Sequence, residues 1–176
     1  LYFIYKIAHA IQLARHLNEQ YPDKHFVPVY YMGSEDNDLD ELGTFHYGGK
    51  KFIWDGNGQQ GAVGRMNTHT LKNLLDDLFK VLGPPSEYTE QLKDLIQQAY
   101  LHHHTIGAAT RYLVNELFGQ YGLVVLDPDD TAFNKEILHI IKDDLLNHTA
   151  NDIVSRQAAR LAEQYKSQAY PRDINL

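Results

Sequence analysis

An apolar run that ends in a block of acids constrains the fold of this chain more than any other feature. Residues 26–32 read Phe-Val-Pro-Val-Tyr-Tyr-Met and follow a helical segment, and five acids then lie between Glu35 and Glu41. A short apolar, β-rich run is typical of a parallel strand covered on both faces, and ligands of open α/β sheets bind beyond the carboxyl ends of such strands. We therefore expect a buried strand that leads into a polar site.

The same pattern returns later in the chain. Residues 121–126 read Tyr-Gly-Leu-Val-Val-Leu, and Asp127, Asp129 and Asp130 follow before a helical pattern begins. Two parallel strands bring both acidic blocks to one edge of a sheet, which predicts a shared site. The alternative is that the acids cap the helices that follow them. Capping by Asp129 or Asp130 is sufficient for the second block, whereas the first block holds more acids than a cap requires.

Periodicity predicts the other elements. Apolar residues recur at helical spacing in four segments, which are residues 1–20, 68–82, about 87–119 and about 131–166, the last with an interruption near residue 148. Alternation around Gly48-Gly49 predicts a β-hairpin over residues 44–54, and a glycine-rich loop follows it. The chain starts with Leu1 and with helical periodicity already running, so we expect it to be a piece of a longer protein.

Composition excludes several classes of function. The chain has 176 residues, enough for one ordinary domain with a core, and no cysteine, which excludes disulfides, thiolate metal sites and a cysteine nucleophile. A net charge of −7 without a basic stripe argues against nucleic-acid binding. No stretch approaches the roughly 20 apolar residues of a membrane span. We expect a soluble, cytoplasmic protein with neither nucleic-acid nor membrane partners.

Three motifs have ordinary explanations beside functional ones. Residues 56–61 match the G-x-G-x-x-G dinucleotide pattern, but no helix can start inside the motif, so a connecting loop is the better interpretation. Consecutive histidines at 102–104 point in different directions on a helix, which favours a helix end or a polar patch over a metal site. Arg65, beside two glycines, is a candidate to bind an anion or to pair with surface acids.

The order of these motifs resembles that of a known family. A helix, the strand ending in Ser34-Glu35-Asp36-Asn37-Asp38, the Gly61-Ala62-Val63-Gly64-Arg65-Met66 segment and the Tyr121-to-Asp127 strand together resemble the bacillithiol biosynthesis cysteine-adding enzyme family. The resemblance implies an α/β fold with a Rossmann-like parallel-sheet core, a β-hairpin and a helical connective insertion. It divides the chain into a partial core, residues 1–55 and 120–176, and an insertion, residues 56–119. It also implies a coiled coil in the longer parent protein.

The resemblance further implies a ligase that forms a carbon–nitrogen bond, adding cysteine to glucosaminyl-malate as an amide. Glu35, Asp36 and Asp38 are then the catalytic candidates, which hold the cysteine ammonium or a metal. The substrate-binding candidates are Ser34, Arg65 and Asp127. The cofactor stays open, with ATP or another nucleotide and Mg²⁺ as the candidates, because carboxylate activation commonly needs them. The implied partners are the two small-molecule substrates and, through the coiled coil of the parent, a second copy in a homodimer.

Two other functions remain open at this point. In the first, the chain is a non-catalytic α/β module that binds a sugar or nucleotide. In the second, it is a scaffold whose acids are caps and whose helices dock a partner. Ligand-dependent stabilisation distinguishes these two, because only a ligand that binds the native state raises stability by mass action.

Overall fold

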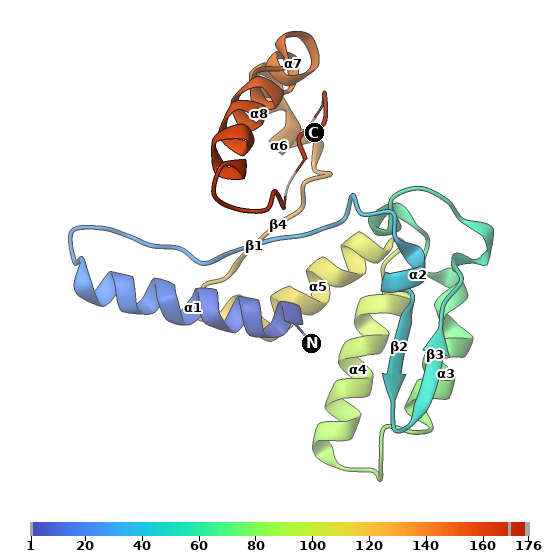
Figure 1. Cartoon of the computed structure of the whole chain (residues 1–176). Coiled ribbons are helices and arrows are strands. Elements are labelled where there is room, and N and C mark those ends of the chain that lie inside the picture. The colour runs from blue at the N-terminus through green and yellow to red at the C-terminus, as the bar shows by residue number, and fades with distance from the viewer. Residues whose placement is uncertain (1, 169, 175–176) are drawn as a thin grey trace. The chain divides into compact units, whose positions relative to one another are not determined.

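The computed structural model describes residues 2–168 and 170–174 (Figure 1). The chain divides into two compact units, Leu1–Pro128 and Asp129–Leu176. The first unit contains the sheet, the hairpin and the α-helices up to residue 118, and the second contains the α-helices from residue 131 onward.

The predicted parallel sheet is present in the first unit. Strand β1 (Val29–Tyr31) pairs in parallel with β4 (Val124–Leu126), and the Met32 amide extends the ladder by donating to the Leu126 carbonyl at 2.9 Å. Parallel strands place their carboxyl ends at one edge. Both acidic blocks of the sequence therefore follow the same edge of one sheet.

Strand β1 is shorter than the apolar run that predicts it. Pro28 has no amide hydrogen for the ladder, and only its carbonyl takes part, by accepting from the Val124 amide at 3.0 Å. Before Pro28, the Asn18 side chain both donates to the Phe26 carbonyl and accepts from the Phe26 amide, each at 2.8 Å. A side chain thus replaces a neighbouring strand as the hydrogen-bond partner of this segment.

Helices α1 (Tyr2–Gln20) and α5 (Ile106–Phe118) pack beside the sheet. Ile7 and Ile11 of α1 form a buried cluster with Val114 of α5 and Leu123, which precedes β4. Complete burial of an aliphatic side chain of this size contributes about 1.5–3 kcal/mol. The apolar stripe predicted over residues 1–20 is therefore the side of α1 that holds it to α5 and the sheet.

The predicted hairpin is confirmed. Strands β2 (Thr44–Tyr47) and β3 (Lys50–Ile53) pair antiparallel, and the two connecting residues, Gly48 and Gly49, have φ angles of 57° and 76°. A two-residue turn with positive φ at both positions follows the twist of the strands, and glycine adopts it without a steric penalty.

The hairpin shares a core with the residues that follow it. The buried members of this core are Phe52, Trp54, Val63, Met66, Leu71, Leu75 and Leu78. They come from β3, from the loop after it and from helix α3 (Lys72–Phe79), and α3 lies beside the hairpin in Figure 1. This packing crosses residue 55, where the sequence suggests a boundary between core and insertion. That division remains a prediction.

The short helix α2 (Leu39–Leu42) lies outside the predicted helical segments. The other helices follow the predicted pattern with shorter spans, and they are α4 (Glu87–His102), α6 (Thr131–Glu136), α7 (Leu138–Asn147) and α8 (Thr149–Ala162). The interruption expected near residue 148 is present, because His148 has a φ of 53° between α7 and α8. No helix in the described ranges, 2–168 and 170–174, is long and apolar enough to cross a membrane.

Candidate functional site

A side-chain hydrogen bond joins the ends of the two parallel strands. The Ser34 hydroxyl, just after β1, donates to Oδ1 of Asp127, just after β4, at 2.5 Å. Ser34 is 6% exposed, and a bond to a carboxylate is stronger than one between neutral groups. The structure therefore brings together two residues that the sequence predicts at one site.

Two glycines allow other segments to approach this junction. A Cβ on Gly64 would lie 2.5 Å from Cβ of Ser34 and 2.5 Å from its carbonyl oxygen. The Gly64 amide donates to that same carbonyl at 3.0 Å. A Cβ on Gly107, in the first turn of α5, would lie 3.0 Å from the Gly64 carbonyl and 3.7 Å from Oδ2 of Asp127. The absence of side chains thus sets the distance between β1, residues 63–65 and α5.

The acids after β1 serve partly as local caps. Oδ1 of Asp38 accepts from the Glu41 amide at 3.0 Å and caps α2. Oδ1 of Asp36 accepts from the Asp38 amide, also at 3.0 Å. Burial raises the pKa of the Tyr31 hydroxyl, and the charge of the exposed Glu35 raises it further by a smaller amount. The helix cap is thus a structural role for Asp38, and the turn uses only Oδ1 of Asp36.

Capping also explains the second acidic block. Asp130 accepts from the Ala132 amide at 2.9 Å, at the start of α6. This is the simpler of the two explanations that the sequence allows for Asp130. Asp127 alone of that block is shown to bond to Ser34.

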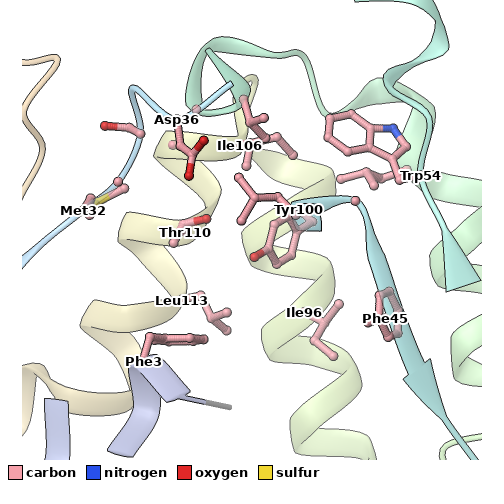
Figure 2. A pocket seen from close by; sticks show the side chains of 18 of the residues that line it. Phe3, Met32, Asp36, Phe45, Trp54, Ile96, Tyr100, Ile106, Thr110 and Leu113 are labelled. Carbon is pink, nitrogen blue, oxygen red and sulfur yellow. The ribbon is translucent and has the colours of Figure 1, made fainter. Parts of the chain in front are cut away.

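A cavity of about 640 Å³ opens beside the junction. Its wall is mainly apolar, and Ser34 and Asp36 lie among its lining residues. Figure 2 shows Asp36, Thr110 and Tyr100 facing this hollow from three segments of the chain. Burial raises the pKa of the Tyr100 hydroxyl, although a hydrogen bond with Thr110 acts in the opposite direction. The Tyr100 hydroxyl is therefore a neutral hydrogen-bonding group at physiological pH.

A second hollow of about 740 Å³ lies against β4 and α5. Its polar lining includes Asp127, Arg111, Asn115 and His103. Nδ1 of His103 lies 3.0 Å from the Ala99 carbonyl oxygen, which can only accept. That nitrogen therefore carries the hydrogen, and Nε2 of the neutral ring is an acceptor. We call this hollow the polar cleft and the first one the apolar cavity.

The described residues contain no cluster of metal ligands, and the glycine-rich segment does not have the geometry of a dinucleotide loop. Mg²⁺ prefers several oxygen ligands in octahedral geometry. Within residues 2–168 and 170–174, no group of three or more histidine, aspartate or glutamate side chains could hold a metal ion. Residues 56–58 form a short turn with Asn57 at a φ of 52°, and α3 begins only at Lys72. The glycine-rich segment is thus a connecting loop, as expected.

Some residues that line the two hollows were candidates from the sequence, and others were not. Arg65 ends a short 3-10 turn, Val63–Arg65, and is exposed outside the lining of either hollow. Tyr100, Thr110 and Arg111 line the hollows but lie inside helices, where the pattern predicts only helical structure. The one available signal was the spacing of Arg111 and Asn115, which are four residues apart and share a helix face.

The fold and the site define an α/β domain with a Rossmann-like parallel sheet and a candidate ligand site at its carboxyl edge. The chain belongs to the family described as bacillithiol biosynthesis BshC, N-terminal Rossmann-like domain, whose model matches residues 1–176. This confirms the resemblance and the Rossmann-like fold class.

The chain is also similar to longer curated proteins. It is 43% identical over 176 residues to a Flavobacterium psychrophilum protein and 40% identical over 176 residues to one from Flavobacterium johnsoniae; all of this chain and 33% of each relative are covered. A Cytophaga hutchinsonii protein is 36% identical over 181 residues, which cover all of this chain and 32% of that protein. All three carry the name "Putative cysteine ligase BshC". The chain spans about a third of the length of these relatives.

Proposed function

We propose that this chain is the substrate-binding part of a ligase that joins cysteine to glucosaminyl-malate through an amide bond. Family membership over the whole chain supports the reaction class, and the names of the relatives support cysteine as a substrate. The structural observation that carries the proposal is the Ser34–Asp127 hydrogen bond. Ser34 lines the apolar cavity and Asp127 lines the polar cleft, so two hollows of different character meet at one junction. Such an arrangement suits a reaction that joins two unlike substrates.

In this proposal the polar cleft holds the sugar-malate. Malate presents carboxylates and glucosamine presents hydroxyls, and the cleft offers the Arg111 guanidinium, the Asn115 amide and the Asp127 carboxylate. A guanidinium can bind a carboxylate through two parallel hydrogen bonds. Arg65, which follows Gly64 in the chain and is exposed, is a second anion-binding candidate.

The acids after β1 bind an ammonium group in this proposal. Glu35, Asp36 and Asp38 are the predicted catalytic candidates, and of the three only Asp36 lines the apolar cavity. An ammonium donates to carboxylate oxygens, and the charge on both partners strengthens each hydrogen bond. Their role is therefore to orient a substrate amine at the end of β1, while Ser34 holds Asp127 in place.

His103 is the candidate proton acceptor of the cleft. When the glucosamine nitrogen attacks the activated cysteine carboxyl carbon, a C–N bond forms, the bond to the leaving oxygen breaks and the nitrogen loses a proton. Nε2 of His103 is an acceptor, because Nδ1 is already bonded to the Ala99 carbonyl. A general base in hydrogen-bond reach typically contributes 10²–10⁴-fold to a rate. We assign no residue of this chain to activation of the carboxylate.

The test is calorimetric titration of glucosaminyl-malate into the protein and into Arg111→Gln. We expect the Arg111→Gln variant to bind at least about tenfold more weakly, which corresponds to the loss of about 1.4 kcal/mol. Arg156→Gln, on α8 and exposed, is the matched control and should bind like the wild type. Absence of binding to the wild type, or equal binding by Arg111→Gln, would refute the proposed use of the cleft.

Turnover separates this proposal from a non-catalytic sugar- or nucleotide-binding module. A longer protein that carries this segment should form the cysteinyl amide, detected by mass spectrometry, and His103→Gln should slow that reaction with little change in sugar-malate binding. Binding without turnover would favour the module. The homodimer through a coiled coil in the parent is a further part of the proposal and concerns residues outside this chain.

A further inference from the structure

The apolar cavity is lined from two sides of the first unit. Phe3, Met32 and Leu113 line it from the α1–α5–sheet side, and Phe45 and Ile96 line it from the hairpin and α4. Large aliphatic and aromatic side chains thus surround a volume of about 640 Å³. Cavities of this size and lining are typical of small-molecule sites when a few polar groups converge on them.

The polar groups of the cavity are few and have different partners. The Tyr100 hydroxyl and Thr110 interact with each other, and the Ser34 hydroxyl is bonded to Asp127. Asp36 is bonded through Oδ1 to the Asp38 amide. Figure 2 shows this carboxylate facing the hollow. The cavity therefore has one negative group at an exposed position and an uncharged interior.

We propose that this cavity binds the amino-acid substrate, with the ammonium on Asp36 and the side chain against the apolar wall. The inference rests on the proposed function, which places an amino acid and a sugar-malate at one junction. Charge complementarity selects an ammonium at Asp36, and the apolar wall selects an uncharged side chain. The polar cleft, lined by Arg111, prefers an anionic group instead, so the charge of each substrate determines which hollow it enters.

The apolar wall also bears on the chemistry of a thiol substrate. Apolar surroundings raise the pKa of a thiol and thereby keep the sulfur protonated and weakly nucleophilic. In the cavity, the cysteine sulfur would thus compete poorly with the glucosamine nitrogen for an activated carboxyl carbon. The volume exceeds that of a cysteine side chain, so the cavity should also accept a somewhat larger uncharged side chain.

Calorimetry with four defined probes tests this inference. L-cysteine under reducing conditions and S-methyl-L-cysteine should bind with similar affinity. N-acetyl-L-cysteine, which lacks the ammonium, and L-aspartate, which has a charged side chain, should each bind at least about tenfold more weakly. Equal binding of N-acetyl-L-cysteine, or no binding of L-cysteine, would overturn the proposal.

Two variants locate the binding in the cavity. Asp36→Asn removes the charge but keeps an oxygen for the Asp38 amide, and Ile96→Phe adds volume where the cavity has room. Both should weaken L-cysteine binding at least about tenfold, whereas Ile153→Phe, at a position 53% exposed on α8, should not. Circular dichroism verifies that each variant is folded.

Failure of this inference is distinguishable from failure of the proposed function. If both variants bind L-cysteine like the wild type while glucosaminyl-malate still binds the cleft, the cavity proposal is wrong and the proposed function stands. If glucosaminyl-malate does not bind the wild type but L-cysteine binding depends on Asp36 and Ile96, the cavity is an amino-acid site and the sugar-malate assignment is wrong.

Discussion

Ser34 and Asp127 are 93 positions apart in sequence, and their side chains bond at 2.5 Å. We predict that Ser34→Ala lowers the free energy of unfolding by about 1.5–3 kcal/mol, because a bond to a charged, half-buried carboxylate is lost. Urea denaturation followed by circular dichroism measures this change. Ser155→Ala is the control, since that exposed hydroxyl has only a 3.4 Å contact to Asn151. Equal stability of the two variants would show that the junction contributes little.

Gly64 gives a second prediction at the residue scale. Gly64→Ala places a methyl group 2.5 Å from Ser34, so β1 or the turn must move, and we expect a loss of about 1–3 kcal/mol of stability. Gly33→Ala is the matched control, because a Cβ there meets nothing within 4 Å. Thermal denaturation of both variants provides the measurement, and a neutral Gly64→Ala would show that the close approach is easily relaxed.

Tyr100 predicts a dependence of stability on alkaline pH. Burial raises the pKa of its hydroxyl in the folded state above the unfolded value near 10. The folded state then holds this proton more tightly, so stability falls as pH rises from about 10 through the raised pKa. In Tyr100→Phe, urea midpoints measured from pH 8 upward should fall less steeply above pH 10 than in the wild type. The exposed variant Tyr88→Phe should keep the wild-type slope.

Sequence patterns locate strand ends well and cavity walls poorly. Asp36 and Asp127 were candidates because a strand delivers each of them to a sheet edge, and Ser34 was a candidate through the family resemblance; their roles remain predictions. Tyr100 and Thr110 were not candidates, because their role depends on how α4 and α5 pack, and helical periodicity shows only that both helices have an inner face. Capping also limited the prediction, since Asp38 and Asp130 accept from helix amides as ordinary caps do.

At the scale of elements, local chemistry fixes the helix starts. Ser86 accepts from the Thr89 amide at 3.2 Å and caps α4, in agreement with the gap between the helical segments predicted at residues 68–82 and about 87–119. We predict that Ser86→Ala lowers stability by about 1 kcal/mol. Ser86→Asn keeps a capping oxygen and should stay close to the wild type in the same urea titration. If both variants lose the same stability, the cap is not the cause.

Element lengths were less predictable than element types. The hairpin followed from two glycines between alternating aromatic residues, which is a local signal. Strand β1 began later than its apolar run, because Pro28 lacks an amide hydrogen and Asn18 binds the segment before it. Helix α3 likewise starts at Lys72 rather than 68, after a 3-10 turn at His69–Leu71. Tertiary hydrogen bonds determine where such strands and helices begin, and the periodicity of the sequence carries no information about these bonds.

At the scale of the molecule, each unit holds its own long-range bonds. The sheet and the Ser34–Asp127 bond lie within residues 1–128. In the second unit, Nδ1 of His148 bonds to the Asp173 carbonyl at 2.7 Å, and the Asn151 amide donates to the Arg172 carbonyl at 2.8 Å. The second unit, Asp129–Leu176, is small for an independently stable domain, and among its described residues no apolar side chain is buried.

This difference between the units predicts how fragments behave. A chain that ends after Pro128 retains the sheet, both apolar clusters and both hollows, so it should unfold in one cooperative thermal transition. The isolated segment 129–176 should be largely unfolded by circular dichroism, because three helices with exposed apolar side chains such as Leu146 and Tyr165 bury too little surface to offset chain entropy. The fragment 1–128 should also bind L-cysteine like the whole chain. A non-cooperative transition in that fragment would contradict this prediction.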